Sequence, residues 1–190
     1  GVACRLTLCG TSLCFINTHL PAGHSHADER NATASEVEEG LRRGFAAPAR
    51  GGPFPPPLEH DVCVWLGDLN YRIELSNEEV RPKIAAGEWR SLLPADQLLI
   101  SQRSGAAFGN FQEAPITFQP TYKYDAGTSV YDTSEKARVP SWTDRVLWHA
   151  SRGGVRSAGY VACEQVLCSD HKPVAALLLW EPSNAAPPAA

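Results

Sequence analysis

The chain has 190 residues, of which 43% are hydrophobic and 20% are charged, and its formal net charge is −4. This composition is typical of a globular protein, and the length suits one domain. The sequence contains no apolar run near the roughly 18 residues of a membrane-spanning helix. Its acidic balance also argues against a protein that binds nucleic acid through a broad basic face.

Six cysteines occur in the sequence without any CxxC pair: Cys4, Cys9, Cys14, Cys63, Cys163 and Cys168. Four of them lie inside apolar, strand-like runs, where a free cysteine acts as a small core residue. We therefore expect buried free thiols rather than disulfides or a zinc site, which indicates a reducing compartment.

The first third of the chain predicts a hairpin, a helix and a buried strand. Two strands are expected at residues 3–9 and 12–19. Residues 28–47 are charged and alanine-rich, with an apolar residue at every fourth position, which predicts a helix. Residues 48–57 hold five prolines and two glycines and predict a loop. The continuous apolar run at 60–67 is typical of a central strand.

The remainder predicts two helices and three further strands. A helix is expected at residues 76–90, capped by Ser76, and a second at 94–103. Strands are expected at 143–149, 155–167 and 173–180. Strands and helices alternate irregularly, with hairpins at both ends of the chain. The pattern therefore predicts an α/β or α+β layered sandwich of mixed sheets flanked by helices, not a doubly wound sheet.

Four polar clusters accompany the predicted strands, and we expect each at a C-terminal strand end: Asn17-Thr18-His19, Gly67-Asp68-Leu69-Asn70, Trp142-Thr143-Asp144-Arg145 and Ser169-Asp170-His171. Residues i and i+2 of an extended chain point the same way, so Asp68 and Asn70 share a face. Each cluster alone has an ordinary interpretation: a turn, a surface hydrogen bond, an ion pair or a core histidine. Together they favour a polar, metal-assisted site.

Five segments, NTHL, WLGDLNYRI, PTYKYD, PSWTDRVLW and SDHKPV, resemble the type II inositol polyphosphate 5-phosphatases. This family is a branch of the exonuclease–endonuclease–phosphatase superfamily, and the resemblance covers about residues 3–181. It implies the layered sandwich of that superfamily. It also implies Mg²⁺-dependent hydrolysis of the 5-phosphate of phosphoinositides, such as PtdIns(4,5)P₂, or of soluble inositol polyphosphates.

The resemblance implies a role for each residue of the polar clusters. Asp68 matches the carboxylate that activates water, and Asn70 matches the amide that orients the water or the phosphoryl oxygens. His19 and His171 match two imidazoles that contact the scissile phosphate. Asp144 matches the carboxylate that hydrogen-bonds to the second imidazole, raising its pKa and fixing its orientation.

A separate set of residues matches the family positions that hold the neighbouring 4-phosphate: Tyr122, Lys123, Lys136 and Arg138. The spacing of Lys136 and Arg138 places an ammonium and a guanidinium on one face. Residues 121–156 carry six Lys or Arg against four Asp or Glu, whereas the whole chain is acidic. A local basic segment in an acidic chain fits a compact polyphosphate, although a solvated loop explains the same spacing equally well.

The resemblance places the principal Mg²⁺ ligand, a glutamate, on a strand upstream of the NTHL segment. The first acidic residue here is Asp28, and Asp170 matches only a carboxylate beside the metal. We therefore expect residues 1–181 to be the C-terminal part of a catalytic domain that is incomplete at its N-terminus, followed by a disordered tail or linker at 182–190. Alone, this chain is expected to show little Mg²⁺-dependent activity and to expose apolar residues of strand 60–67, such as Val62 and Val64.

Two other interpretations stay open: a catalytically inactive fragment that binds anionic headgroups or protein partners, and a sibling phosphodiesterase of the same superfamily. The leading interpretation predicts a cytoplasmic protein that associates peripherally with membranes and binds no nucleic acid. His24 and His26 have metal-like spacing but no third ligand nearby, so we expect them to be solvated.

Overall fold

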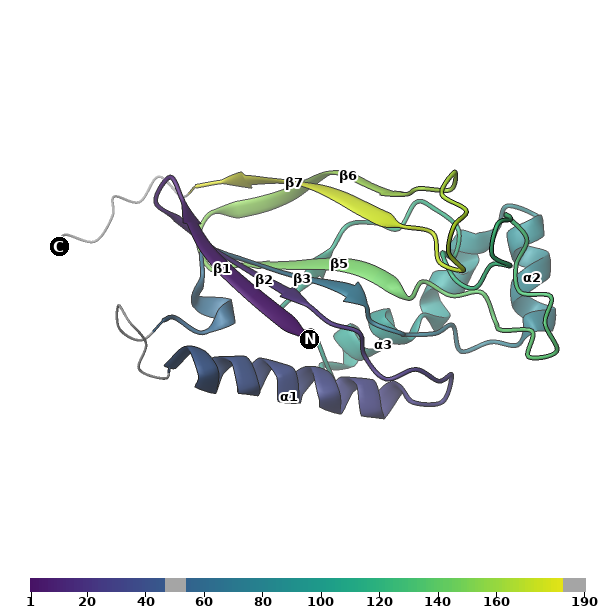
Figure 1. Cartoon of the computed structure of the whole chain (residues 1–190), viewed down its shortest axis with the longest axis horizontal. Coiled ribbons are helices and arrows are strands. Elements are labelled where there is room, and N and C mark those ends of the chain that lie inside the picture. Colours follow the sequence, from purple (N-terminus) through teal and green to yellow (C-terminus); the bar gives the residue numbers. More distant parts are fainter. Residues whose placement is uncertain (47–53, 183–190) are drawn as a thin grey trace.

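The computed structural model describes residues 1–46 and 54–182, which form three layers (Figure 1). A five-stranded sheet lies in the middle, and the long helix α1 (Ala27–Ala46) runs along one face of it. A separate hairpin of β6 (Gly154–Ala162) and β7 (Val174–Glu181) covers the other face. The predicted layered sandwich with mixed sheets and flanking helices is confirmed.

The middle sheet has the order β1-β2-β3-β5-β4. Its strands are β1 (Val2–Leu8), β2 (Thr11–Asn17), β3 (Val62–Asp68), β5 (Asp144–Ala150) and the two-residue β4 (Gln112–Glu113). β2 and β3 are parallel, so their C-terminal ends lie at one edge, and β5 runs antiparallel to β3. The start of β5 therefore lies at the same edge as the end of β3.

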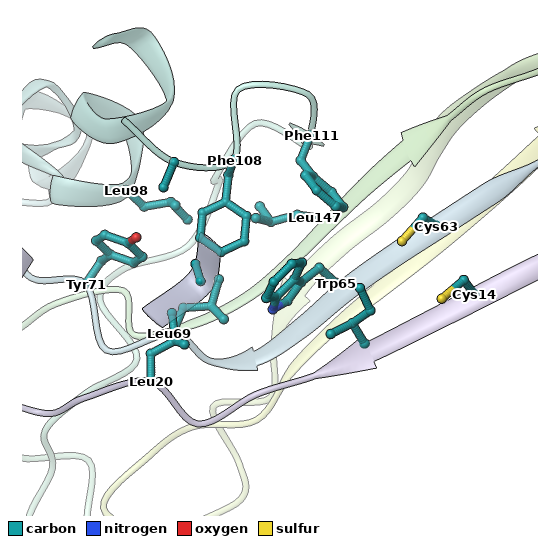
Figure 2. Packing of buried hydrophobic residues seen from close by; sticks show 13 residues of the cluster. Cys14, Leu20, Cys63, Trp65, Leu69, Tyr71, Leu98, Phe108, Phe111 and Leu147 are labelled. Atoms are coloured by element: carbon teal, nitrogen blue, oxygen red, sulfur yellow. The ribbon is translucent and has the colours of Figure 1, made fainter. Parts of the chain in front are cut away.

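Side chains of β3 alternate between the two faces of the sheet. Cys63 and Trp65 point toward α1, where Trp65 packs edge to face against Phe108 and Phe111 with ring centroids 5.0 and 5.8 Å apart (Figure 2). Val62 and Val64 point toward the β6–β7 hairpin. Both faces of this strand are thus covered, as the continuous apolar run predicts.

The expectation that strand 60–67 exposes apolar surface is wrong for these valines. Val62 is 5% exposed and Val64 is 7% exposed, because the β6–β7 hairpin packs over them. Exposed apolar side chains lie instead on other strands, with Val2 and Leu8 of β1 and Leu177 of β7 more than half exposed.

The helices at the end of the sheet differ in length from the prediction. α2 (Asn77–Ala85) begins after Ser76, as predicted, with the Glu79 carboxylate accepting a hydrogen bond from the Ser76 backbone. It stops before residue 90, because Gly87 adopts a left-handed conformation just beyond it. Residues 89–95 then form a 3₁₀ helix, followed by α3 (Gln97–Ser104).

Two further expectations concern chain ends and loops. β6 ends at Ala162 rather than at 167, because residues beyond it form a turn in which the Val166 N–H donates to the Cys163 carbonyl. The proline-rich loop at 48–57 lies mostly outside the described residues, which resume at residue 54. Of the tail predicted at 182–190, only residue 182 belongs to the described residues.

All six cysteines are free thiols, as predicted. The prediction that the thiols are buried is correct only for Cys14 and Cys63, which face each other on β2 and β3. Cys4, Cys9 and Cys168 are exposed. A strand-like run does not bury a cysteine on an edge strand such as β1. Within the part of the chain that the structure describes, no helix has the length and apolar character needed to cross a membrane.

Candidate active site

The functional edge of the sheet begins where β2 and β3 end together. Backbone hydrogen bonds continue their pairing beyond the strands, from Thr18 N–H to the Leu66 carbonyl at 3.1 Å and from Leu20 N–H to the Asp68 carbonyl at 3.0 Å. Gly67 permits this approach: a Cβ atom there would lie 2.2 Å from the Thr18 carbonyl oxygen, and its φ is +128°. Only glycine fits such a position. Consequently the segments carrying His19 and Asp68 emerge side by side.

Asp68 is the most enclosed carboxylate of this edge. Its side chain is 20% exposed, whereas that of His19, whose Nε2 lies 3.5 Å from Asp68 Oδ2, is 75% exposed. Burial raises the pKa of Asp68 above its ordinary value, and the nearby Asp144 carboxylate adds to the rise. A carboxylate with a raised pKa is suited to accept a proton near neutral pH.

Asp144 and His171 form a hydrogen-bonded pair beside Asp68. Asp144 is the first residue of β5 and lies opposite Asp68 in the strand register. His171 Nδ1 is 2.8 Å from Asp144 Oδ2, and the Thr143 hydroxyl donates to the same oxygen at 2.9 Å. Burial lowers the pKa of His171, but the Asp144 hydrogen bond and charge outweigh burial, so its pKa is raised. His171 Nε2 makes no hydrogen bond to the described residues.

The structure thus brings His19, Asp68, Asp144 and His171 together as one carboxylate–imidazole group. Two of the four polar clusters differ from expectation in their placement. Asp144 is the first residue of β5, and His171 lies three residues before β7, so neither is at a C-terminal strand end. Asp144 reaches the same edge because β5 runs antiparallel to β3, and an isolated bridge to Tyr122 holds the backbone of His171.

Asn70 lies under this group and is only 2% exposed. Its φ is +57°, a conformation that asparagine tolerates better than most residues. Its backbone N–H donates to Asp68 Oδ1 at 3.0 Å, its amide donates to the Leu20 carbonyl at 3.0 Å, and its amide oxygen accepts from Arg72. At most one amide N–H is left for a bound group.

A cavity of about 350 Å³ opens next to the carboxylate–imidazole group, and we call it the cationic cavity. Its lining includes three cationic side chains, those of Arg72, Lys136 and Arg138, and the ring of Tyr122. The Tyr122 ring lies between the cationic cavity and the carboxylate–imidazole group. The centroid of the Tyr122 ring lies 4.5 Å from that of the His171 ring. The guanidinium carbon of Arg72 lies over the Tyr122 ring, 4.4 Å from its centroid.

Two sequence-derived candidates lie slightly apart from these groups. Lys123 Nζ lies 3.8 Å from Asp170 Oδ2, and Lys123 does not line the cationic cavity. Asp170 and His171 are adjacent in an extended segment, so their side chains point in different directions. In the described residues, the carboxylate of Asp170 therefore contacts Lys123 rather than the carboxylate–imidazole group.

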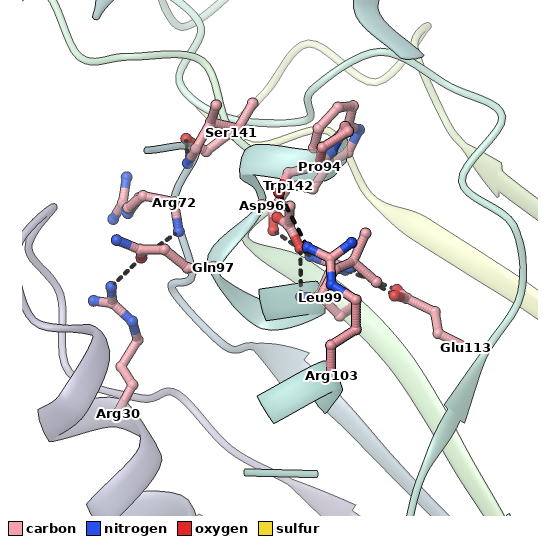
Figure 3. Close-up of polar contacts among 12 residues, drawn as sticks. Arg30, Arg72, Pro94, Asp96, Gln97, Leu99, Arg103, Glu113, Ser141 and Trp142 are labelled. Atoms are coloured by element: carbon pink, nitrogen blue, oxygen red, sulfur yellow. Dashed lines mark hydrogen bonds and ion pairs between the residues drawn. The ribbon is translucent and has the colours of Figure 1, made fainter. Parts of the chain in front are cut away.

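A buried ion-pair network supports the start of β5, and Figure 3 labels its two acidic members, Asp96 and Glu113. Arg145, the residue after Asp144, donates to both oxygens of Asp96 at 3.0 and 3.1 Å and to Glu113 at 2.6 and 2.7 Å. The Arg145 side chain is fully buried. The sequence suggested an ion pair between Asp144 and Arg145; the structure pairs each of them with a different partner, since adjacent strand residues face opposite sides.

The donor set at this edge fits a hard divalent cation. Ligand atoms of Asp68, Asp144 and His171 lie within 4.8 Å of one another. His171 Nδ1 and one Asp144 oxygen are engaged with each other, so the oxygens of Asp68 and the second oxygen of Asp144 are the available donors. Mg²⁺ accepts one or two carboxylates together with water and substrate phosphate oxygens.

Some residues at the site escaped the sequence analysis. Arg72 stands two positions after Asn70, and its i+2 spacing was a usable signal that the same face continues. His24 is exposed, as the sequence predicted, but the sequence did not indicate that it lines the cationic cavity. Its position depends on how a distant side chain holds its loop, which no local pattern reveals.

Comparisons with known proteins agree with this fold. The family model described as Endonuclease/Exonuclease/phosphatase family 2 matches residues 1–177. The chain is 45% identical over 174 residues to Inositol-1,4,5-trisphosphate 5-phosphatase 1 of Schizosaccharomyces pombe, covering 92% of this chain and 15% of that protein. It is 41% identical over 186 residues to synaptojanin of Caenorhabditis elegans, covering 95% of this chain and 16% of that protein.

A solved structure shares both fold and sequence with the chain. It is the inositol polyphosphate 5-phosphatase domain of spSynaptojanin in complex with inositol (1,4)-bisphosphate and a calcium ion. The TM-score is 0.82 at 43% identity, and the match covers 92% of this chain and 48% of that one. The chain therefore spans about half of this solved chain and less than a fifth of the two curated relatives.

Proposed function

Since the chain belongs to the endonuclease/exonuclease/phosphatase family, with inositol polyphosphate 5-phosphatases among its relatives, we propose that it removes the 5-phosphate from phosphoinositides or soluble inositol polyphosphates. One observation carries the proposal. The carboxylate–imidazole group and the cationic cavity share the Tyr122 ring, so two adjacent phosphates of one inositol can occupy both at once.

In the proposed reaction, the oxygen of a water molecule bonds to phosphorus while the bond from phosphorus to the inositol oxygen breaks. Asp68 accepts the proton that the water loses, and that proton equivalent returns to the leaving oxygen, giving an inositol hydroxyl and inorganic phosphate. The raised pKa of Asp68 suits this transfer.

The two histidines stabilise the phosphoryl oxygens in this proposal. Asp144 holds His171 through Nδ1 and favours its imidazolium form, which leaves Nε2–H to donate to a phosphoryl oxygen. The exposed His19 imidazole approaches the same phosphate from the β2 side. Mg²⁺ held through the free oxygen of Asp144 would neutralise charge on the phosphate, and Asp170 is a further candidate beside the metal.

The cationic cavity supports recognition of the neighbouring 4-phosphate. Arg138 can bind a phosphate through two N–H groups, while Lys136 acts as a point charge. Lys123, which contacts Asp170, is proposed to join them by turning its ammonium group from that carboxylate to the 4-phosphate. Because phosphoinositide headgroups lie at a bilayer surface, we further propose that the protein associates peripherally with membranes in the cytoplasm.

The test is release of inorganic phosphate by the full-length protein from inositol 1,4,5-trisphosphate and from PtdIns(4,5)P₂ vesicles, with Mg²⁺ present or chelated. Asp68→Asn should lower kcat at least about 100-fold, as loss of a general base does. Asp28→Asn, in the exposed first turn of α1, is the matched control and should retain activity. The same assay on residues 1–190 alone tests the expectation that this stretch has little activity.

Other outcomes would favour the alternative functions. Tight binding of inositol polyphosphates without phosphate release by the full-length protein would indicate a binding protein. Cleavage of a phosphodiester, with no release of the 5-phosphate, would indicate a sibling phosphodiesterase. The cationic cavity argues for the monoesterase, because a second phosphate next to the scissile group requires such a cavity and a simple diester does not.

A further inference from the structure

His24 belongs to the wall of the cationic cavity. It lies on the loop between β2 and α1, and its side chain lines the same space as Arg72, Lys136 and Arg138. The residue is exposed at the rim, so a ligand can reach it from solvent. Three permanent cations and one imidazole thus surround a space large enough for a phosphate.

Buried side chains hold the loop of His24 in place. Arg30, which has no exposed surface, donates from Nη1 to the carbonyls of Pro21 and Gly23 at 3.1 and 2.7 Å. Gln97 Nε2 donates to the carbonyl of His24 itself at 2.9 Å. Three hydrogen bonds to the carbonyls of Pro21, Gly23 and His24 make this loop a defined wall of the cavity.

The same glutamine also positions Arg72. Gln97 Oε1 accepts from Arg30 Nη2 at 2.5 Å and from the Arg72 backbone N–H at 2.9 Å (Figure 3). Gln97 is 3% exposed, so solvent does not compete for these bonds. One buried amide therefore couples the His24 loop to the strand-end segment that carries Arg72, and fixes both relative to the cavity.

The neighbouring histidine provides an internal contrast. His26 Nδ1 lies 2.9 Å from Glu29 Oε2 on the first turn of α1, and His26 does not line the cavity. Within the described residues, His24 has no comparable carboxylate partner. The two histidines look alike in sequence, but only His24 faces the cations.

The charges around His24 favour its neutral form in the free protein. Burial lowers the pKa of His24, and the cations Arg72, Arg30 and Arg138 lower it further, while Glu74 opposes them. Lys136 lines the same cavity and adds positive charge. A phosphate dianion placed among these groups reverses the balance, because negative charge favours the imidazolium form.

We propose that His24 is a further phosphate-binding residue of the cationic cavity, which takes up a proton from bulk solvent when a phosphate monoester enters. The imidazolium then donates a charge-assisted hydrogen bond to a phosphate oxygen. The inference deepens the proposed function, since it assigns a proton-dependent contact to the cavity that holds the non-scissile phosphate. It predicts that this contact strengthens as the pH falls.

The experiment measures binding of inositol 1,4-bisphosphate by calorimetry at pH 6 and pH 8, using the full-length protein and its His24→Gln and His26→Gln variants. His24→Gln should weaken binding about fivefold at pH 6, the value of a partly exposed charged hydrogen bond, and less than about twofold at pH 8. His26→Gln should match the wild type at both pH values. The ligand itself titrates near pH 6, but this effect cancels in the ratio between variants.

Two further measurements distinguish phosphate binding by His24 from the proposed 5-phosphatase activity. Calorimetry of the wild type in two buffers of different ionisation enthalpy should show proton uptake that His24→Gln lacks. Inositol 1-phosphate, which has no second phosphate, should bind equally to wild type and His24→Gln. None of these measurements requires turnover, so a protein without 5-phosphatase activity can still satisfy them.

The inference is overturned if His24→Gln binds inositol 1,4-bisphosphate as tightly as the wild type at pH 6. It is also overturned if His26→Gln loses as much affinity, because the loop rather than the imidazole would then be responsible. Unchanged thermal unfolding of both variants shows that the comparison concerns binding and not folding.

Discussion

Asp68 and Asp144 face each other in the register of β3 and β5, whereas Lys136 and Arg138 lie on a loop outside any helix or strand. The carboxylate–imidazole group thus takes its geometry from backbone pairing. The cationic cavity takes its geometry from side chains that bind loop carbonyls, and these side chains come from α1, α2 and α3. The groups that need fixed distances lie at the ends of paired strands, and the cationic groups lie on loops that side-chain hydrogen bonds hold in place.

The loop that carries Lys136 and Arg138 illustrates the second kind of construction. Asp132 accepts hydrogen bonds from the backbone N–H groups of Ser134 and Arg138 at 3.1 and 2.8 Å. Arg81 of α2 donates to the Asp132 carbonyl at 2.7 Å. A few polar contacts therefore define the cavity wall, and a single substitution can alter it without disturbing the sheet.

The largest effect is expected where the sheet itself is supported. Arg145→Ala leaves Asp96 and Glu113 buried without their cation, which should lower the free energy of unfolding by about 3–5 kcal/mol. Urea unfolding measures this loss. The control is Arg156→Ala, whose ion pair with Glu181 is exposed and contributes less than about 1 kcal/mol. Equal losses in the two variants would contradict the supporting role of Arg145.

The comparison also explains what the sequence could predict. Strand-like patterns and a continuous apolar run place His19 and Asp68 at strand ends, because such patterns report on where strands lie. The long segments around Asp68, Asp144 and His171 identify the family. Local patterns were therefore sufficient for the layered sandwich and for the residues that the sheet brings together.

Other features depend on tertiary contacts that leave no local pattern. The cover of Val62 and Val64 depends on a hairpin that begins at residue 154, some ninety positions later. The orientation of His24 depends on Gln97 and Arg30, and the two-residue β4 is too short for any periodicity. These contacts link segments far apart in the chain, so only the structure reveals them.

The next largest effect is expected on the pH dependence of activity, which tests the carboxylate–imidazole group. The pKa of His171 is raised because Asp144 outweighs the effect of burial, so the imidazolium persists to higher pH and activity should fall as pH rises through that pKa. Asp144→Asn removes the charge, which should move this basic limb of kcat/KM to lower pH. At pH 8 we expect activity to fall about 100-fold or less, within the range of acid–base effects.

Asp170→Asn is the matched control, because Asp170 adjoins His171 but contacts Lys123. Its charge contributes less to the pKa of His171 than that of Asp144 does, so the basic limb should move less. A basic limb that stays in place in Asp144→Asn would show that another group titrates. Loss of Mg²⁺ dependence or of all activity in Asp170→Asn would instead support the metal-side role that the family resemblance implies.

The smallest effect belongs to the cationic cavity. Lys136→Ala or Arg138→Ala removes one charge-assisted contact to the 4-phosphate, which is worth about 1.5–3 kcal/mol in a favourable geometry. We therefore expect kcat/KM for 4,5-bisphosphorylated substrates to fall about tenfold or more, while a substrate without the 4-phosphate is nearly unaffected.

Arg152→Ala, beyond the opposite end of β5, serves as the charge-matched control. Because the cavity wall is a loop and not a strand, thermal unfolding should stay unchanged. Equal losses on both substrates would show that these residues support the 5-phosphate site, and the separation between a sheet-built catalytic group and a loop-built recognition cavity would then fail.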